Sequence, residues 1–189
     1  AGGKISTPIF IATPNHVRGA GDGAEAAEAY LPNPACTSPS DLERFAFVGT
    51  LCGAAARFTS FMELELPSLC WKSVLGQSID SHELRAVDVK TAAHIESVLA
   101  IDDETTWALR QEEDPVCWCI RLANNEGVAL RGDGRGLVAF AEREEYAAAA
   151  EKTYLAASAR QLEAMARGFF SVFPQLGARL LTWRELERR

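Results

Sequence analysis

The sequence lacks a hydrophobic run long enough to cross a membrane. Its longest apolar stretch, residues 45–58, reads FAFVGTLCGAAARF, whereas a helix that spans a bilayer core needs roughly 20 apolar residues. Basic residues are also scarce, since 19 Lys and Arg stand against 26 Asp and Glu for a net charge of −7. We therefore expect neither a nucleic-acid partner nor a membrane partner, and we interpret residues 45–58 as a buried helix.

Motifs for common catalytic chemistry are missing as well. The glycines of residues 19–23 lack the Gly-Lys-Ser/Thr ending of a phosphate-binding loop, and no Gly-x-Ser-x-Gly nucleophile elbow occurs. The Arg-Gly-Asp tripeptide at 131–133 falls in a predicted hairpin turn, which accounts for its composition. The carboxylates at 102–104 and 112–114 are consecutive, and charge at that density favours a solvated face over a general acid–base pair. The residues alone indicate no catalytic constellation.

The spacing of the cysteines shows no disulfide framework. The chain has five cysteines, an odd number, which favours a reducing compartment and a cytoplasmic location. Cys117 and Cys119 lie two apart on a predicted strand, so both side chains point to one face and a metal or redox pair is geometrically possible. The three histidines are scattered along the chain and add no further ligand. We expect packed free thiols, with no metal and no cofactor.

Length and composition indicate one soluble globular domain of 189 residues, 48% of them hydrophobic and 24% charged. The pattern predicts an α+β fold that is mainly α, with a small antiparallel β meander. The expected elements, in chain order, are a strand at 5–13, a loop at 14–30, turns at 31–37, a helix at 39–58, an alternating segment at 62–67, a helix at 68–76, a helix at 80–101 that breaks near Asp88, an acidic connector at 102–115, the meander at 116–140, a helical region at 141–173 ended by Pro174, and a final short helix.

Several helix ends carry local signals. Ser38 stands three residues before Asp41 and directly before a proline, and Asp80 stands three residues before Glu83. Both spacings are typical of capped helix starts. Gly76 is expected to end the helix that begins at 68.

The predicted helix at 39–58 is apolar on two faces, so we expect both faces to be buried. Gly49 and Gly53 lie on a common stripe of this helix. A missing Cβ weakens a helix by roughly 1 kcal/mol, but it lets a neighbouring element come close. The helix is therefore predicted to be the central helix of the domain.

A series of motifs runs in order along the chain. It consists of Phe45-x-Phe47-x-Gly49-x-Leu51-x-Gly53-x-Ala55-x-Arg57, then Leu64-x-Leu66-Pro67, then Trp71-Lys72-x-x-Leu75. This series resembles the core of the N-terminal lobe of HECT-type ubiquitin ligases. The resemblance continues to Glu185-Leu186-Glu187 and covers nearly the whole chain. Phe10-x-x-Thr13-Pro14-Asn15 and Leu84-x-x-Val87-Asp88 are most similar to the large HERC branch of that family.

The resemblance implies an elongated, mostly helical lobe in which residues 1–189 form a partial HECT domain, without the start of the N-terminal lobe and without the C-terminal lobe. In the family this lobe binds a ubiquitin-conjugating enzyme, and a cysteine in the C-terminal lobe carries ubiquitin before it passes to substrate lysines. The parent protein would then be an enzyme, a ubiquitin-protein transferase. This chain has no Thr-Cys-Phe-type catalytic segment, so we expect it to be inactive alone. The expected partners are a ubiquitin-conjugating enzyme, ubiquitin and the missing C-terminal lobe.

The resemblance also implies where the conjugating enzyme binds. Carried over by position, the groove consists of helical positions and two aromatic residues: Thr91, Ile95, Val98, Ile101, Trp118 and Tyr146. The helical positions are three or four apart and share a stripe, as either a partner-binding face or a core face would. We expect Ile95→Asp to abolish binding and to leave the fold intact.

Three positions depart from the family pattern. Thr91 is smaller than the family's usual apolar residue, which bears on the strength of partner binding. Ala139 and Glu142 stand where the family usually has capping Thr and Asn, which bears on a local turn.

Two alternatives remain open. One is a non-catalytic helical scaffold or peptide-binding module. This alternative would be favoured if the native gene encoded no further lobe with a Thr-Cys motif. The other is a small-molecule hydrolase that uses Cys117 or Cys119, which would require turnover sensitive to thiol alkylation.

Overall fold

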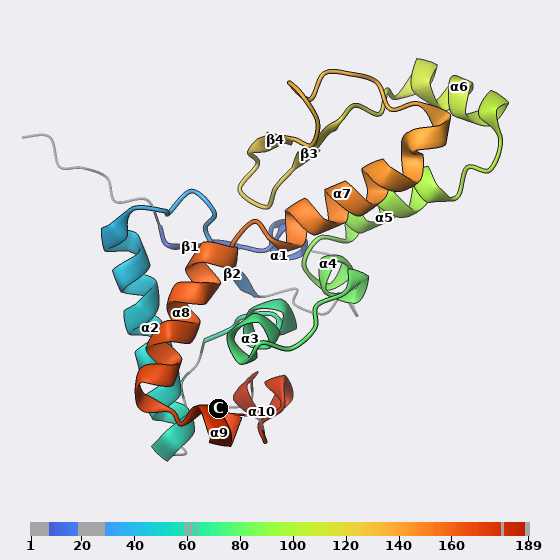
Figure 1. The fold of residues 1–189 in the computed structure, drawn as a ribbon. Coiled ribbons are helices and arrows are strands. Elements are labelled where there is room, and N and C mark those ends of the chain that lie inside the picture. Colours follow the sequence, from blue (N-terminus) through green and yellow to red (C-terminus); the bar gives the residue numbers. More distant parts are fainter. Residues whose placement is uncertain are drawn as a thin grey trace, which may run out of the picture.

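The computed structural model describes residues 8–18, 29–58, 60, 62, 64–178 and 180–187 (Figure 1). Its helices are α1 (Pro14–Arg18), α2 (Pro39–Phe58), α3 (Ser68–Leu75), α4 (Ser81–Val87), α5 (Val89–Leu99), α6 (Glu104–Glu113), α7 (Arg143–Leu155), α8 (Ala159–Val172), α9 (Gln175–Ala178) and α10 (Trp183–Glu187). The strands β1 (Phe10–Ala12) and β2 (Tyr30–Pro32) form one antiparallel pair, and β3 (Cys119–Arg121) and β4 (Gly127–Ala129) form another. The predicted α+β, mainly α fold class is confirmed.

The molecule is elongated. Figure 1 shows α2, α8, α3 and α10 gathered at one end, while α5 and α7 run side by side toward the other end, where α6 and the β3–β4 hairpin lie. One hydrophobic core runs through both parts and includes side chains from Leu31 to Leu186. The second part is the smaller one, and it carries most of the residues predicted for partner binding.

α2 and α8 cross in direct backbone contact because both helices carry glycine at the crossing. A Cβ built on Gly49 would lie 1.9 Å from the carbonyl oxygen of Met165, and one built on Gly168 would lie 1.8 Å from the carbonyl oxygen of Ala46. No side chain fits at either position. The predicted close neighbour at Gly49 and Gly53 is therefore confirmed, and it is α8.

The outer face of α2 is not buried, so the expectation that both apolar faces of this helix pack inside is wrong. Phe45 is fully buried, whereas Phe47, Leu51 and Phe58 are 63%, 43% and 71% exposed. No element among the described residues covers these three side chains. Helical periodicity identifies an apolar face, but it does not say whether the same chain covers that face.

The predicted helix ends are confirmed. The Asp80 side chain accepts a backbone N–H in the first turn of α4, and the Glu83 side chain accepts the N–H of Asp80 at 2.9 Å. Asp88 ends α4 and caps α5, where its carboxylate accepts the N–H of Thr91 at 3.2 Å. Gly76 follows α3 with φ of 67°, the left-handed conformation that a side chain disfavours.

The predicted acidic connector at 102–115 is instead a helix, α6. The Asp103 carboxylate accepts the N–H of Thr106 at 2.9 Å and so caps the helix, and Trp107 is its buried side chain. The Trp107 indole N–H donates to the carbonyl of Val138 at 3.1 Å. Gln111 adds two more bonds, since its side chain donates to the Val138 carbonyl at 2.7 Å and accepts the N–H of Val116 at 2.7 Å. The cap, the buried indole and these bonds together hold a helix in an acidic sequence.

Short elements account for the remaining differences. The segment 14–37, predicted as loop and turns, contains α1 and β2, and its residues 19–28 lie outside the described residues. Of the strand predicted at 5–13, the described residues form β1, and residues 5–7 lie outside the described part. The segment predicted to alternate at 62–67 forms no strand in its described residues, although the Glu65 carbonyl accepts the N–H of Tyr30 at 2.8 Å.

Two predicted segments are divided in the structure. The meander at 116–140 reduces to the β3–β4 hairpin and one antiparallel bridge between Cys117 and Leu137. The helical region at 141–173 breaks after Leu155 into α7 and α8, and it ends before Pro174 as predicted. The break bends the chain from the small part of the molecule back to the large part.

Candidate partner-binding site

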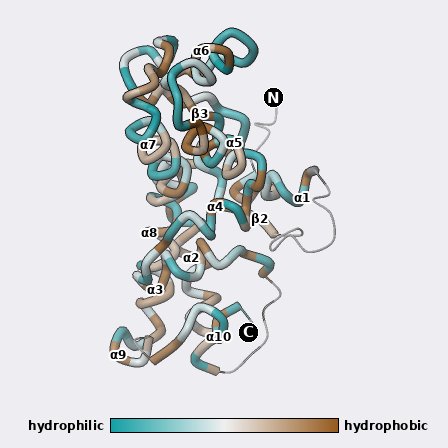
Figure 2. Tube along the Cα trace, turned by 90° about the vertical axis from the view of Figure 1, so that its right-hand side faces the viewer, coloured by the Kyte–Doolittle hydropathy of each residue, from teal (hydrophilic) through white to brown (hydrophobic). Residues whose placement is uncertain are grey.

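The candidate site lies where β3 meets α5 and α7. Figure 2 shows strongly hydrophobic residues at β3 beside these helices. Tyr146 is the central side chain: its hydroxyl donates to the Cys119 carbonyl at 3.4 Å and lies 3.2 Å from Nε2 of His94. The Trp118 ring meets the Tyr146 ring edge-on, with centroids 5.9 Å apart. We call His94, Trp118 and Tyr146 the aromatic cluster.

The structure brings the predicted groove residues together but buries most of them. Ile95, Val98, Trp118 and Tyr146 are all at most 4% exposed, so the chain itself covers these side chains. They form the floor of the site and leave little surface for a partner. A charge at Ile95 would be buried without a partner, which is strongly destabilising, so the expectation that Ile95→Asp leaves the fold intact is wrong.

The other two predicted groove residues keep part of their surface. Thr91 is half-buried, and its hydroxyl donates to the Asp88 carboxylate at 2.7 Å, so it helps to hold the residue that caps α5. Ile101 is half-buried and packs against the core from just beyond the end of α5. Their role in binding a partner stays a prediction.

Arg131, in the loop after β4, packs against the ring of Trp118. The Arg131 guanidinium lies 3.6 Å from the centre of the Trp118 ring. The same guanidinium donates to Glu142 at 2.7 Å and to Glu145 at 2.6 Å. The hydrogen bond from Arg131, together with the N–H of Ala139, holds the pKa of Glu142 below its usual range. Arg131 therefore joins the hairpin loop to the start of α7.

The aromatic cluster is uncharged at neutral pH. Burial lowers the pKa of His94, the nearby positive charge of Arg110 lowers it further, and Asp114 opposes both effects. Burial also raises the pKa of Tyr146 to about 12. Both side chains are consequently neutral near pH 7, which suits a site that recognises a partner by shape and apolar contact rather than by charge.

The surface around the cluster is acidic and partly apolar. The predicted solvated carboxylates at 102–104 and 112–114 are all exposed, and Asp114 pairs with Arg110 at 2.6 Å. Leu99, Leu109 and Leu137 are 46%, 58% and 60% exposed in the same part of the molecule. These leucines supply exposed apolar surface, which the buried floor residues do not.

Sequence reasoning missed two residues of this site. The sequence places His94 among three scattered histidines, but His94 also stands next to Ile95 and four residues before Val98, which is a usable signal. Arg131 lies in a predicted turn. Nothing in the local sequence links it to Trp118, because that contact depends on the path of the hairpin.

The motif residues from the first half of the chain are structural. Gly49 and Gly53 let α8 approach, and the Arg57 guanidinium donates to the Val172 carbonyl at 3.2 Å. Pro67 directly precedes α3, and Lys72 of α3 pairs with the buried carboxylate of Glu83. Of the aromatic members, Phe45 and Trp71 are buried, and Phe47 is exposed.

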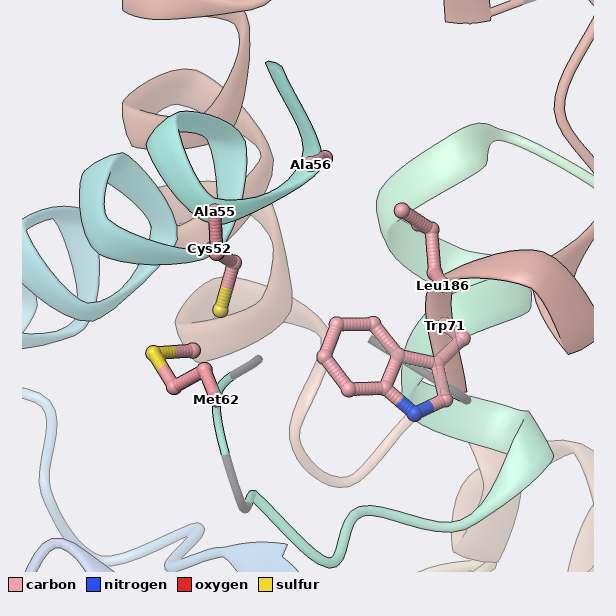
Figure 3. Close-up of a pocket in the computed structure, with 6 residues that line it drawn as sticks. All are labelled: Cys52, Ala55, Ala56, Met62, Trp71 and Leu186. Atoms are coloured by element: carbon pink, nitrogen blue, oxygen red, sulfur yellow. The ribbon is translucent and has the colours of Figure 1, made fainter. Parts of the chain in front are cut away.

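A small cavity beside Trp71 does not form a ligand site. Figure 3 shows its lining side chains: Cys52, Ala55, Ala56, Met62, Trp71 and Leu186. Its volume of about 10 Å³ is near the minimum for one water molecule. Within the described part of the chain, no group of three His, Cys, Asp or Glu side chains is arranged to hold a metal ion.

Comparison with known proteins gives the family. Residues 11–189 match the model of the HECT-domain (ubiquitin-transferase) family, and the chain therefore belongs to this family. It is 28% identical over 181 residues to the E3 ubiquitin-protein ligase HERC2 of Mus musculus and equally so to that of Homo sapiens. Each match covers 96% of this chain and 4% of the relative. The predicted resemblance to HECT ligases and to their large HERC branch is confirmed.

The described residues contain no helix that is both long and apolar enough to span a bilayer. α2, the longest helix at 20 residues, instead packs along α8.

Proposed function

We propose that the chain is the N-terminal lobe of a HECT-type ubiquitin ligase and that it binds a ubiquitin-conjugating enzyme at the site where β3 meets α5 and α7. The observation that carries the proposal is the aromatic cluster, of which Trp118 and Tyr146 stand at positions implied by the family resemblance, with exposed apolar side chains in the same part of the molecule. The match to HECT domains and the similarity to HERC2 support it.

In this proposal the lobe acts by binding and orientation. The floor residues Ile95, Val98 and Tyr146 set the shape of the site, and Thr91, Ile101 and the exposed part of α5 contact the partner. The conjugating enzyme would then be held so that ubiquitin passes to a cysteine of a C-terminal lobe and on to substrate lysines. The parent protein would be a ubiquitin-protein transferase of the cytoplasm, and this chain would be inactive alone.

The rigid floor is the physical basis of the proposed binding. Side chains already fixed by packing lose little conformational entropy when a partner docks, so more of the contact energy appears as affinity. Arg131 contributes by holding Trp118 against the cluster, and the hydrogen bonds of Tyr146 fix its ring.

The proposal is tested by hydrogen exchange. The chain is titrated with a panel of ubiquitin-conjugating enzymes, and amide protection is mapped for the free and bound forms. We expect at least one enzyme to protect α5, β3 and the start of α7, and to leave the α2–α8 pair unchanged. Protection confined to the outer face of α2, around Phe47 and Leu51, would instead favour a scaffold that binds its partner there. Absence of binding across the panel would refute the proposal.

A further inference from the structure

The chain separates its cysteines into two groups. Cys36, Cys52 and Cys70 are at most 6% exposed, and burial raises the pKa of Cys52 to about 12. Cys117 is half-buried and Cys119 is exposed, so the expectation of packed thiols is wrong for Cys119. Since the thiolate is the reactive form and must be reached by its reagent, the three buried thiols are protected and the remaining two are not.

The two accessible thiols share one face of their segment. Along residues 116–121 the even-numbered positions are buried, and the odd-numbered positions are half-buried or exposed. Both sulfur atoms therefore lie on the outer side of the segment, opposite the buried indole of Trp118.

A tight turn shortens the distance between the two cysteines. Two residues of extended strand separate Cα atoms by roughly 6.6 Å, which is close to the upper limit of about 6.8 Å for a disulfide. Here the N–H of Cys119 donates to the carbonyl of Cys117 at 2.7 Å, so Trp118 stands at the centre of a three-residue turn. The chain turns because Cys117 bridges to Leu137 while Cys119 pairs with Ala129. The turn therefore brings the Cα atoms of Cys117 and Cys119 closer together than an extended strand would, as a disulfide between them requires.

We propose that Cys117 and Cys119 form a reversible thiol-oxidation site, at which a hydroperoxide converts the two thiols to an intrachain disulfide. The more exposed Cys119 thiolate attacks a peroxide oxygen: an S–O bond forms, the O–O bond breaks, and the leaving oxygen takes a proton to become water or an alcohol. The Cys117 thiolate then attacks this sulfenic acid. The S–S bond forms, the S–O bond breaks, and the departing hydroxide takes the second proton to become water. The two sulfurs lose two electrons, which reduce the peroxide.

The disulfide would fix the turn beside the aromatic cluster. Trp118 lies between the two cysteines, and its ring contacts Arg131 and Tyr146. Oxidation would thus act on the backbone that positions the Trp118 indole. The proposed chemistry needs only the two thiols and a peroxide, so its test does not depend on the proposed binding of a conjugating enzyme.

The test is peptide mapping after oxidation of the folded chain. The chain is treated with hydrogen peroxide, remaining thiols are alkylated, and the protein is digested with trypsin. Residues 111–121, QEEDPVCWCIR, form one tryptic peptide that contains Cys117 and Cys119 and no other cysteine. We expect this peptide to lose two hydrogen atoms, to escape alkylation and to recover both thiols with dithiothreitol. The peptides that carry Cys36, Cys52 and Cys70 should stay reduced and serve as the internal control.

Three results would overturn the proposal. In the first, the peptide of the folded chain keeps two alkylatable thiols at peroxide doses that do oxidise it when the chain is unfolded in urea. In the second, the peptide carries sulfinic or sulfonic acid. In the third, a non-reducing gel shows the chain linked to a second chain. Cys117→Ser is the matched variant: without the second thiol, Cys119 should proceed to higher oxidation states that dithiothreitol does not reverse. Equal recovery of the Cys119 thiol in the variant and the parent chain would also contradict the proposed disulfide.

Discussion

The Arg131 guanidinium lies 3.6 Å from the centre of the Trp118 ring. Arg131 belongs to the loop after β4, and Trp118 directly precedes β3. The same guanidinium pairs with two carboxylates, that of Glu142, which directly precedes α7, and that of Glu145 in α7. One side chain thus joins the hairpin to the helix that carries Tyr146.

Arg131→Lys is expected to loosen the hairpin. A lysine ammonium cannot stack flat on an indole or donate to two carboxylates in a fork. We expect weaker near-ultraviolet circular dichroism from the tryptophans and faster amide exchange in β3 and β4. Arg135→Lys is the matched control, because Arg135 is exposed in the same loop, and it should change neither signal. Unchanged exchange in Arg131→Lys would mean that the stacking does not hold the hairpin.

Stability should depend on pH through His94. Its pKa is lowered in the folded chain, so the unfolded chain binds more protons once the pH falls below about 6.5. The free energy of unfolding should therefore be highest above about pH 7 and should decrease as the pH falls below about 6.5. His94→Gln should flatten this part of the curve, as measured by urea unfolding between about pH 5 and 7.5. Parallel curves for the two proteins would contradict the assignment to His94.

Gly49→Ala should damage the α2–α8 contact. The new methyl would lie 1.9 Å from the Met165 carbonyl oxygen, and that atom belongs to the backbone of a helix. Overpacking of this kind typically costs about 1–3 kcal/mol, and the rigid partner places this site at the upper end. Gly127→Ala is the control, since a Cβ there meets no atom within 4 Å. Urea unfolding of both variants gives the comparison, and equal midpoints would rule out backbone contact at Gly49.

Glu83→Gln should destabilise the link between α3 and α4. Glu83 is 1% exposed and pairs with Lys72, so removing its charge leaves a largely buried ammonium without its counter-charge. Breaking a buried ion pair costs about 3–5 kcal/mol, and the loss here should fall at or below the lower end, because the glutamine oxygen can still accept a hydrogen bond from the ammonium. The double variant Lys72→Met/Glu83→Gln should recover part of the loss, because the unpaired charge is gone. If the double variant is as unstable as the sum of the single variants, the two residues are not coupled.

The helix ends could be predicted because their signals are local. Asp80, Glu83 and Gly76 act on backbone groups within a few residues, so spacing alone identifies them. α6 was missed for the opposite reason. Its acidic sequence has little apolar periodicity, and its position is set by hydrogen bonds from Trp107 and Gln111 to the distant Val138 carbonyl. β2 was missed because three residues form a strand only through pairing with β1.

The candidate site could be located only in part from the sequence. The family resemblance identified Tyr146 and Trp118, and the structure brings them into contact. The stripe on α5 has the same spacing whether it faces a partner or the core, and packing against α7 decided that Ile95 and Val98 are buried. The contact of Arg131 with Trp118 depends on a loop whose path no local signal predicts.

Binding at the exposed side of α5 is the most direct test of the proposed function. Ser97 lies three residues after His94 and is exposed, and its hydroxyl donates to the His94 carbonyl at 2.7 Å. Ser171 of α8 is an exposed serine with the same type of bond, to the Gly168 carbonyl at 2.6 Å. Ser97→Arg and Ser171→Arg therefore make equivalent changes at two distant places. In calorimetric titrations with a ubiquitin-conjugating enzyme, we expect Ser97→Arg to weaken binding at least tenfold, about 1.4 kcal/mol, and Ser171→Arg to leave it unchanged. Equal affinity of the two variants would contradict the proposed site.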